Sequence, residues 1–279
     1  MKKFIISEQE RAEIKKLYDL REDMMSDFLK GFMSMGGLDT GEKLSNDKST
    51  EEKPTDKSTD VEKTDDVSPK TVIDGDVKVT GNFNSEQLKN INYLIDEMNK
   101  IGLKDPLAQI GVLSVINKES NFIPVNENSY ATTSNDRLRK LFGKRLSKYS
   151  DEELSQLKKN DREFFNVIYA KTVGNQGGDD GYKYRGRGFN QLTGIKNYEK
   201  YGQLIGMGNK LVEDPELVND TEIAAKIAIA FLIGNKSPSS FPKFKSKVDA
   251  ASYFADINAG GSSSHRSKAI EKTENFAVA

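Results

Sequence analysis

The segment Tyr184-Arg185-Gly186-Arg187-Gly188-Phe189-Asn190-Gln191-Leu192-Thr193-Gly194 decides how this 279-residue chain is interpreted. Glycines alternate in it with Arg and Tyr, so that the backbone can pass close to a ligand while flat or forked side chains face that ligand. Such a surface suits a sugar chain, which offers hydroxyl edges and apolar ring faces. Gln191 and the nearby Asn197 both donate and accept hydrogen bonds, so they can bind hydroxyl or acetamido groups. The Gly-x-Gly spacing lacks the context of a dinucleotide fingerprint or a P-loop, which excludes both.

The composition excludes several chemistries. The chain has no Cys, so thiol nucleophiles, disulfides, zinc fingers and iron–sulfur clusters are excluded. His265 is the single His, so a His-rich metal site is excluded and a Ser-His-Asp triad would have to use that residue. Carboxylates remain for hydrolytic work, and the chain has 43 of them.

The composition also divides the chain into three zones. Residues 1–37 contain a capping box at Ser7-Glu8-Gln9-Glu10 and then apolar residues at helical spacing, which predicts an amphipathic helix. We expect residues 7–37 to dock on a partner, either a virion or a membrane surface; the alternative is a helix packed on its own protein. Residues 38–82 are rich in Lys, Ser, Thr, Asp and Glu, which predicts a flexible charged linker with a short strand-like patch at Val77-Lys78-Val79. Removal of residues 1–82 is therefore expected to leave the activity of the rest largely unchanged.

Residues 83–279 are predicted to form a mainly helical domain. Strand signals are few, and the main irregular segment is the Gly-rich stretch 174–194. Capping boxes or apolar stripes predict helices that begin near Asn84, Leu107, Ser150, Thr221 and Val248. The small excess of Lys and Arg in this zone is too small to argue for nucleic acid as a partner.

No apolar run approaches the roughly 18 residues that a membrane-spanning helix needs. The start, Met1-Lys2-Lys3-Phe4-Ile5-Ile6-Ser7, has too few apolar residues for a secretory signal, which needs about 7 or more. We therefore expect a protein that is made and kept in a cytoplasm unless other machinery exports it.

Two carboxylates are candidates for acid–base chemistry. Glu119 ends an apolar helical stripe, where burial and the negative end of the helix dipole favour its protonated form. Glu127 lies in a polar loop that we expect to be hydrated, so it should stay ionised. One dry and one hydrated carboxylate is an arrangement that glycosidases use. The alternative interpretation of Glu119 is a residue that ends the helix and faces water. For His265, a position at the start of a helix is favoured over contact with substrate.

These segments resemble glycoside hydrolase family 19, and more closely its bacteriophage endolysin branch. The resemblance covers about residues 85–276. It rests on the segment 184–194 together with Asn197-Tyr198, Glu119-Ser120-x-Phe122, Glu127-Asn128-Ser129-Tyr130-Ala131, Asp214-Pro215-Glu216-Leu217, and Ile257-Asn258-Ala259-Gly260-Gly261 with Arg266. The residue before Glu119, which is often His in this family, is Lys118 here.

The resemblance implies a mainly α, lysozyme-like, two-lobed helical domain. It implies hydrolysis of β-1,4 bonds in N-acetylated glycans with inversion, with Glu119 as the acid and Glu127 as the base and without a metal or organic cofactor. Asp179, Asp180 and Glu163 are alternatives for the second carboxylate. The resemblance assigns substrate binding to Tyr130, Tyr184, Arg187, Gly188, Gln191, Asn197, Tyr198, Asn258 and Arg266.

The leading hypothesis is a peptidoglycan-cleaving endolysin or virion-associated lysin whose partner is the glycan strand of a bacterial wall. Without a signal peptide, it would remain in the host cytoplasm until holin-type release or would be delivered in a particle. A chitinase of the same family is the second hypothesis. A catalytically inactive glycan-binding or virion structural protein is the third, although such a relative would be expected to have lost the carboxylate pair.

Overall fold

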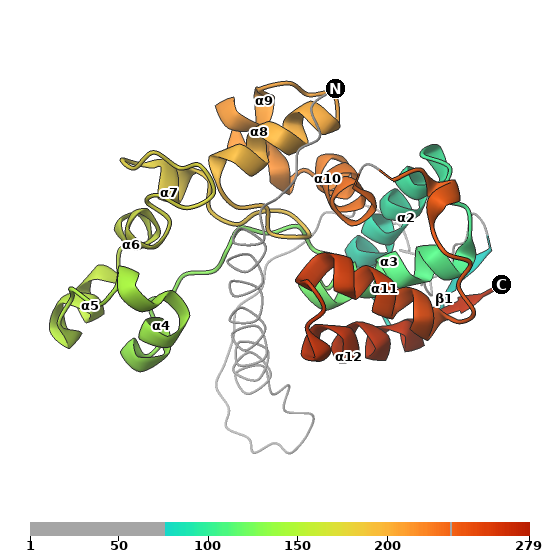
Figure 1. Ribbon diagram of the computed structural model, residues 1–279, viewed down its shortest axis with the longest axis horizontal. Coiled ribbons are helices and arrows are strands. Elements are labelled where there is room, and N and C mark those ends of the chain that lie inside the picture. Colours follow the sequence, from blue (N-terminus) through green and yellow to red (C-terminus); the bar gives the residue numbers. More distant parts are fainter. Residues whose placement is uncertain (1–75, 235) are drawn as a thin grey trace, which may run out of the picture. The chain divides into compact units, whose positions relative to one another are not determined.

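The computed structural model describes residues 76–234 and 236–279, all of which belong to one compact unit of the chain. The helix predicted within residues 7–37 and the linker up to residue 75 lie outside the described residues. The mainly helical domain predicted from the sequence is confirmed, since helices dominate the described part of the chain (Figure 1).

Eleven α-helices occur among the described residues: α2 (Ser85–Lys100), α3 (Pro106–Ser120), α4 (Asn135–Phe142), α5 (Asp151–Leu157), α6 (Asp161–Ile168), α7 (Asp180–Lys183), α8 (Ile195–Leu204), α9 (Lys210–Glu213), α10 (Thr221–Ile233), α11 (Lys247–Ala259) and α12 (Ser263–Lys272). The same part of the chain has short 3₁₀ turns: η1 (Gly143–Arg145), η2 (Pro215–Asn219), η3 (Pro238–Ser240) and η4 (Thr273–Asn275). Its two short strands are β1 (Val77–Val79) and β2 (Phe276–Val278).

Local capping signals set the starts of several helices, as the sequence predicts. Asn84 and Gln87 form a reciprocal capping box at the start of α2, and Ser150 and Glu153 form another at the start of α5. The side chain of Asp220 accepts hydrogen bonds from the first turn of α10. Because each signal lies within three residues of the backbone groups that it satisfies, it can be identified without knowing the tertiary structure.

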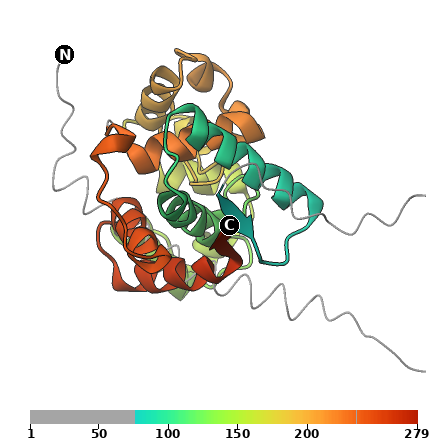
Figure 2. The same ribbon diagram turned by 90° about the vertical axis from the view of Figure 1, so that its right-hand side faces the viewer.

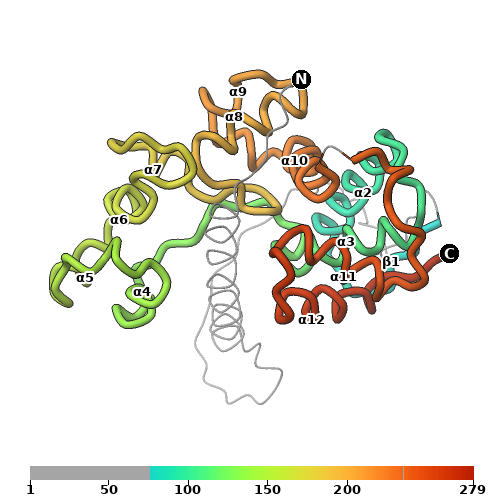
Figure 3. The backbone as a smooth tube through the Cα atoms, viewed as in Figure 1, coloured from blue at the N-terminus to red at the C-terminus, as the bar shows by residue number. Residues whose placement is uncertain are grey.

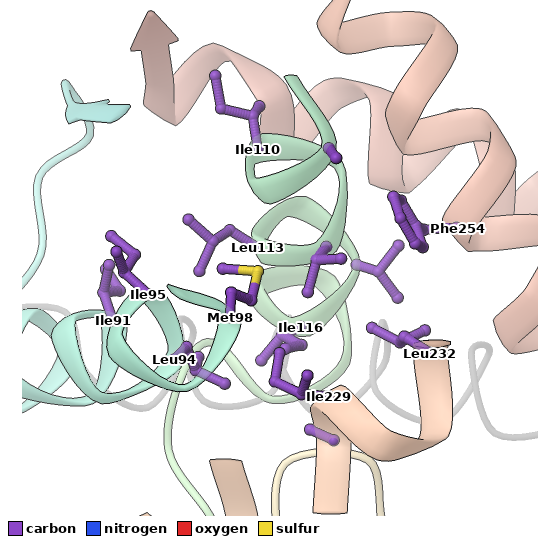
Figure 4. Packing of buried hydrophobic residues seen from close by; sticks show 14 of the residues in the cluster. Ile91, Leu94, Ile95, Met98, Ile110, Leu113, Ile116, Ile229, Leu232 and Phe254 are labelled. Atoms are coloured by element: carbon purple, nitrogen blue, oxygen red, sulfur yellow. The ribbon is translucent and has the colours of Figure 1, made fainter. Parts of the chain in front are cut away.

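Helix α3 is the central helix of the largest hydrophobic core. Every residue from Ala108 to Asn117 is buried, because α2, α10, α11 and α12 pack around it. Its approach to α11 depends on Gly111, since a Cβ atom there would lie 2.7 Å from the backbone carbon of Ala250. The apolar residues of α2 face those of α3, and α10 and α11 complete the core (Figure 4).

Two further clusters hold the helices that follow. Tyr130, Phe142, Phe164, Phe165 and Tyr169 form an aromatic cluster between α4 and α6, with ring centroids 5.2–6.4 Å apart. A second hydrophobic cluster joins α8, α9, η2 and α10. Figure 1 shows α4–α7 at one side of this unit and α2, α3, α11 and α12 at the other, with α10 between α8 and the central helix.

The two strands join the start and the end of the described chain. β1 pairs antiparallel with β2, so that Val77 lies opposite Val278 and Val79 opposite Phe276 (Figure 2). Val77 and Val79 are only 1% and 8% exposed and belong to the largest core. The domain therefore begins at or before Val77, and the predicted boundary at residue 83 is too late. A three-residue strand is a weak local signal, and its partner lies about 200 residues further along the chain.

None of the helices in residues 76–234 and 236–279 combines the length and the apolar character needed to cross a membrane.

Candidate active site

The first candidate carboxylate, Glu119, lies in the last turn of α3. The helix ends because Asn121 adopts a left-handed conformation, with φ of 49°, and Phe122 follows with φ of 62°. The chain then runs without a regular element to α4, and Figure 3 follows this segment. It begins at Asn121, two residues after Glu119, and carries Glu127, the second candidate.

Side chains from three helices surround the carboxylate of Glu119. Asn258 of α11 donates a hydrogen bond to Oε1 over 2.6 Å, and Lys118 Nζ lies 2.8 Å from the same oxygen. His265 of α12 places Nδ1 3.7 Å from Oε1, and its ring also contacts Lys118 Nζ. The site thus joins Glu119 and Asn258, both predicted as site residues, to Lys118 and His265. The prediction that His265 lies at the start of a helix is confirmed, and its side chain is buried beside Glu119.

The expected protonation of Glu119 is wrong for the free protein. Burial raises the pKa of Glu119, as expected at the end of an apolar helix, but the charges and hydrogen bonds of Lys118 and His265 together outweigh burial and lower this pKa to about 2. The carboxyl group is therefore charged at neutral pH. Lys118 is adjacent in sequence, whereas His265 is brought to the site only by the packing of α12 against α3.

Glu127 is not the hydrated loop residue that was expected. It is 9% exposed, and its Oε1 accepts hydrogen bonds from the hydroxyl groups of Tyr130 and Tyr169, over 2.7 and 2.8 Å. Its Oε2 accepts a bond of 3.0 Å from the backbone N–H of Gly186. Its own backbone N–H donates to the carbonyl of Gly186 over 2.7 Å. The carboxylate is therefore oriented by three donors and fixed to the Gly-rich segment.

The Gly-rich segment forms a tight turn beside Glu127. Arg187 and Leu192 exchange two backbone hydrogen bonds that close the turn. Gly188 has φ of 75°, and a Cβ atom there would lie 2.9 Å from the carbonyl oxygen of Val218. Gln191, with φ of 54°, donates to the carbonyl of Val125 over 2.8 Å. Gln191 therefore lies next to the segment that carries Glu127, which is compatible with its predicted binding role.

Arg187 and Tyr198 lie in the interior, contrary to the expectation that they face a ligand. Arg187 is 2% exposed and Tyr198 is fully buried. Arg187 donates to the hydroxyl oxygen of Tyr198 over 2.9 Å and pairs with Glu216 of η2, while Tyr198 donates to the carbonyl of Arg185 over 2.7 Å. These contacts fix the Gly-rich turn to α8 and η2 on its buried side. An Arg between glycines can either bind a ligand or form a buried ion pair. The sequence alone did not distinguish these two roles for Arg187.

The other predicted binding residues lie in three different settings. Tyr130 and Tyr184 are buried, the first against Glu127 and the second within the cluster of α8 and α9. Asn197, in the first turn of α8, donates to the carbonyl of Thr193. Arg266 forms a two-pronged pair with Asp256 at the contact of α11 and α12.

The alternatives for the second carboxylate belong to a surface region around α6 and α7. Asp179 forms a two-pronged pair with Arg162, and the hydrogen bonds from Arg162 lower the pKa of Asp179. Asp180 accepts from the backbone of Gln176, and Glu163 is exposed in the first turn of α6. The hydrogen bonds of Asp179 and Asp180 are to Arg162, Asn166 and Gln176 of this surface region. Glu127 is thus the second carboxylate that the Gly-rich turn holds.

Sequence reasoning missed residues that have no motif of their own. Tyr169 reaches Glu127 from 42 positions away, and Asn219 bonds both Asn126 and the backbone of Gly188. In the part of the chain that the structure describes, no group of three or more His, Asp or Glu side chains is arranged to hold a metal ion.

Comparison with known proteins gives a partial match. The family model described as class I chitinase, glycoside hydrolase family 19, matches residues 159–253. The chain is 52% identical over 50 residues to the acidic 26 kDa endochitinase of Solanum lycopersicum, which is 18% of this chain and 20% of that protein. It is 35% identical over 98 residues to the acidic endochitinase pcht28 of Solanum chilense, which is 30% of this chain and 39% of that protein. It is also 35% identical over 66 residues to a glycosyl hydrolase family 19 domain-containing protein of Haemophilus influenzae, covering 23% of this chain and 32% of that protein.

These matches cover between about a fifth and two fifths of the relatives' own lengths. The region matched by the family model includes the Gly-rich turn and the buried Arg187–Tyr198 pair. It does not include Glu119, Glu127, Asn258 or His265, so the carboxylate environments rest on the geometry of this chain.

Proposed function

Because residues 159–253 are of the glycoside hydrolase family 19 type, we propose that this chain is a glycoside hydrolase that cleaves β-1,4 bonds of N-acetylated glycans, and that its substrate is the glycan strand of bacterial peptidoglycan. The observation that carries the proposal is the pair of oriented carboxylates. Glu119 is held by Asn258 and Lys118, and Glu127 is held against the Gly-rich turn by Gly186. Each carboxylate has a defined orientation, which acid–base catalysis requires.

In the proposed mechanism Glu119 protonates the glycosidic oxygen. Asn258 and Lys118 both bind its Oε1, so we assign Oε2 to the leaving group. To act as an acid, Glu119 must first gain a proton, because its low pKa leaves it charged in the free protein. Asn258 stays in contact with the carboxyl group whether it is charged or neutral, and so keeps the orientation through the proton transfer.

Glu127 would activate the attacking water. The hydroxyl groups of Tyr130 and Tyr169 occupy Oε1, and the N–H of Gly186 restrains Oε2 from one side. A second lone pair on Oε2 can then accept a proton from water. Inversion requires the two carboxyl groups to be roughly 6.5–9.5 Å apart, with the water between them. The released sugar would carry the α configuration at its new reducing end.

Hydrolysis of chitin is a second candidate function. Both Solanum relatives are named endochitinases, and chitin shares the N-acetylated, β-1,4-linked backbone of peptidoglycan. The same carboxylate pair would serve either polymer. Discrimination would depend on whether the site admits the lactyl and peptide substituents of the wall.

We further propose, from the motif resemblance, that the chain acts as a bacteriophage endolysin or a virion-associated lysin. In the first case it would reach the wall after holin-type release, and in the second it would arrive with the particle. Residues 7–37 would supply the docking helix for a virion or membrane partner, and nucleic acid is not expected as a partner.

The test compares the full chain on purified peptidoglycan and on colloidal chitin. Mass spectrometry of released muropeptides identifies the bond that is cut, and NMR during the first turnovers identifies the anomer. We expect new reducing ends, the α-anomer first, and a higher rate on peptidoglycan. Peptides released without new reducing ends would contradict the proposal, and cleavage of chitin alone would establish the second candidate.

The matched variants are Glu119→Gln and Glu152→Gln, the latter an exposed glutamate of α5. Glu119→Gln should abolish release of reducing ends while its circular dichroism spectrum stays that of the wild type. Glu152→Gln should hydrolyse at the wild-type rate. If Glu119→Gln retains that rate, Glu119 is not the acid.

A further inference from the structure

Two buried ionisable groups lie beside Glu119: Lys118, which the proposed mechanism uses only to hold Oε1, and His265, which it does not use. The side chains of Lys118 and His265 are only 6% and 2% exposed. Lys118 Nζ contacts both Glu119 Oε1 and His265 Nδ1, and the imidazole lies 3.7 Å from the same carboxylate oxygen. A lysine and a histidine therefore meet at one oxygen of one carboxylate.

This arrangement is costly to bury unless the charges compensate one another. A buried ammonium group loses its hydration, and only a nearby anion can offset that loss. Glu119 is the anion that the structure provides, and Asn258 adds a neutral donor to the same Oε1. Since all three neighbours act on Oε1, they orient the carboxyl group as well as affecting its charge.

We propose that Lys118 and His265 are positioning residues that act through Glu119: they keep its carboxyl group charged in the free protein and fix its orientation through Oε1. This inference rests on the proposed function, because it concerns the residue assigned as the acid. It adds that the loading of this acid with a proton is controlled by a pair of residues from α3 and α12.

The groups that face Glu119 come from three helices. Lys118 belongs to α3 itself, His265 to α12 and the uncharged Asn258 to α11. Lys118 and His265 are the groups whose charge lowers the pKa of Glu119. Asp256 of α11 and Arg266 of α12 compensate each other's charge through a bidentate contact. Removal of Lys118 should therefore change the protonation of Glu119 more than removal of any other charge.

The single histidine of the chain makes this inference directly measurable. In the full-length protein labelled with ¹³C and ¹⁵N, His265 gives the sole imidazole signals. Because Nδ1 lies 3.7 Å from Glu119 Oε1, these signals should shift when Glu119 takes up its proton. The titration is recorded for the wild type, Lys118→Met, Lys118→Arg and Glu119→Gln, with Lys100→Met as the control. Lys100 forms an exposed ion pair with Glu97 on α2.

We expect the wild type and Lys100→Met to show the Glu119 transition near the low end of the accessible pH range, as the pKa of about 2 requires. Lys118→Met should move this transition up by roughly two pH units or more, because burial raises the pKa of Glu119 and the charge of Lys118 no longer lowers it. Lys118→Arg should keep it low, and Glu119→Gln should lack it. A wild-type titration in Lys118→Met, or an unchanged transition in Glu119→Gln, would overturn the inference. Should Lys118→Met fail to fold, Lys118→Gln is the substitute that keeps the side-chain polarity.

Activity gives a second and separate measurement. On the glycan that the wild type cleaves, Lys118→Met should move the alkaline limb of kcat/KM to higher pH and lower kcat, whereas a purely structural role would lower activity without moving the limb. His265→Gln should move the limb in the same direction by a smaller amount. If the wild type cleaves neither glycan, the proposed function fails while the NMR titration still decides the inference. If the wild type is active and Lys118→Met titrates as the wild type does, the inference fails alone.

Discussion

At Glu127, two phenol hydroxyl groups and one backbone N–H meet on a single carboxylate. The phenols belong to rings that pack in the aromatic cluster of α4 and α6. Their positions are therefore set by hydrophobic packing, and the hydrogen bonds to Glu127 transmit that rigidity to the candidate base. Tyr169 is in this sense as much a part of the site as Tyr130, although it belongs to no recognised motif.

Replacement of Tyr169 by Phe should show this contribution. The ring contacts remain and one donor to Glu127 Oε1 disappears, which costs a hydrogen bond to a charged group, on the order of 1.5–3 kcal/mol. We expect kcat for glycan hydrolysis to fall roughly tenfold or more, and the unfolding temperature to fall by several degrees because of the lost hydrogen bond. Tyr93→Phe on α2 is the control and should behave as the wild type. Equal activity of Tyr169→Phe and wild type would show that Tyr130 and Gly186 suffice.

Glu119 should also make stability depend on pH. Its pKa is about 2 in the folded protein and 4.5 as an ordinary glutamate, so the unfolded chain binds its proton first as the pH falls. The stability from this group is therefore fully present above about pH 4.5 and is lost as the pH falls toward 2. Urea unfolding of the wild type and Glu119→Gln should differ most above pH 4.5 and converge near pH 2. A difference that does not change between pH 7 and 3 would contradict the ion pairing of Glu119.

The sequence identified Glu119, Glu127 and Asn258 as candidates, but it did not show the neighbours of Glu119 and it gave the wrong surroundings for Glu127. The end of an apolar stripe correctly predicts the burial of Glu119. It does not show that His265, which is 147 positions from Lys118, lies beside this carboxylate. The polar composition around Glu127 predicts a hydrated loop, yet its partners Tyr169 and Gly186 lie 42 and 59 positions away. A carboxylate's protonation depends on the groups within a few ångströms, and those groups are set by tertiary contacts.

At the scale of elements, α3 determines where Glu119 lies. Four other helices cover it, so a displacement of α3 would move the candidate acid relative to Asn258 on α11 and His265 on α12. In this packing Gly111 lies so near the backbone of Ala250 that a Cβ atom at residue 111 would come within 2.7 Å of it. This contact controls the separation of α3 and α11.

Gly111→Ala should therefore destabilise the protein. An alanine inside a helix normally gains about 1 kcal/mol over glycine, but here its Cβ would lie 2.7 Å from the backbone of Ala250. We expect a net loss of roughly 1–3 kcal/mol in the free energy of unfolding, measured by urea denaturation. The added substitution Ala250→Gly should recover only part of the loss, because the backbone of residue 250 is also in contact. A single variant more stable than the wild type would show that the helices separate at little cost.

Capping boxes predicted the starts of α2 and α5, whereas α4, α6 and α8 were not predicted. In the capping boxes at Asn84 and Ser150 the two partner residues are only three positions apart, so these helix starts can be recognised in the sequence. Helices α4, α6 and α8 are each ten residues or fewer, too short for their apolar periodicity to stand out. For α3 the sequence predicted an apolar stripe in a largely buried helix, and the structure buries every residue from Ala108 to Asn117, because four helices pack around it.

At the scale of the whole molecule, the limits of the folded unit can be tested by truncation. A chain that begins at Asp76 keeps β1, whereas one that begins at Phe83 loses the burial of Val77 and Val79. We expect the first to match the full chain in glycan hydrolysis and the second to lose several kcal/mol of stability, since burial of a Val contributes roughly 1.5–3 kcal/mol. Release of reducing ends measures the hydrolysis, and thermal unfolding followed by circular dichroism measures the stability.

Full-length variants provide the control for this truncation. Val77→Ser should lower the unfolding temperature, and Lys78→Ser, at the exposed position between the two valines, should not. If the chain beginning at Phe83 is as stable as the one beginning at Asp76, the strand pair contributes nothing. The sequence predicted the mainly helical class correctly because helical signals are local, but it assigned β1 to the linker because strand pairing is not.

The pairing of β1 with β2 brings the two ends of the described polypeptide together: the N–H of Ala279 donates to the carbonyl of Asp76 over 2.8 Å. The first and last described residues, Asp76 and Ala279, are thus neighbours in space. A reporter or affinity tag fused after Ala279 would consequently stand next to the point where residues 1–75 are attached, and could interfere with whatever they bind. Fusions at that end should therefore be compared with insertions in an exposed turn such as Gly177-Gly178 before any binding by the first zone is interpreted.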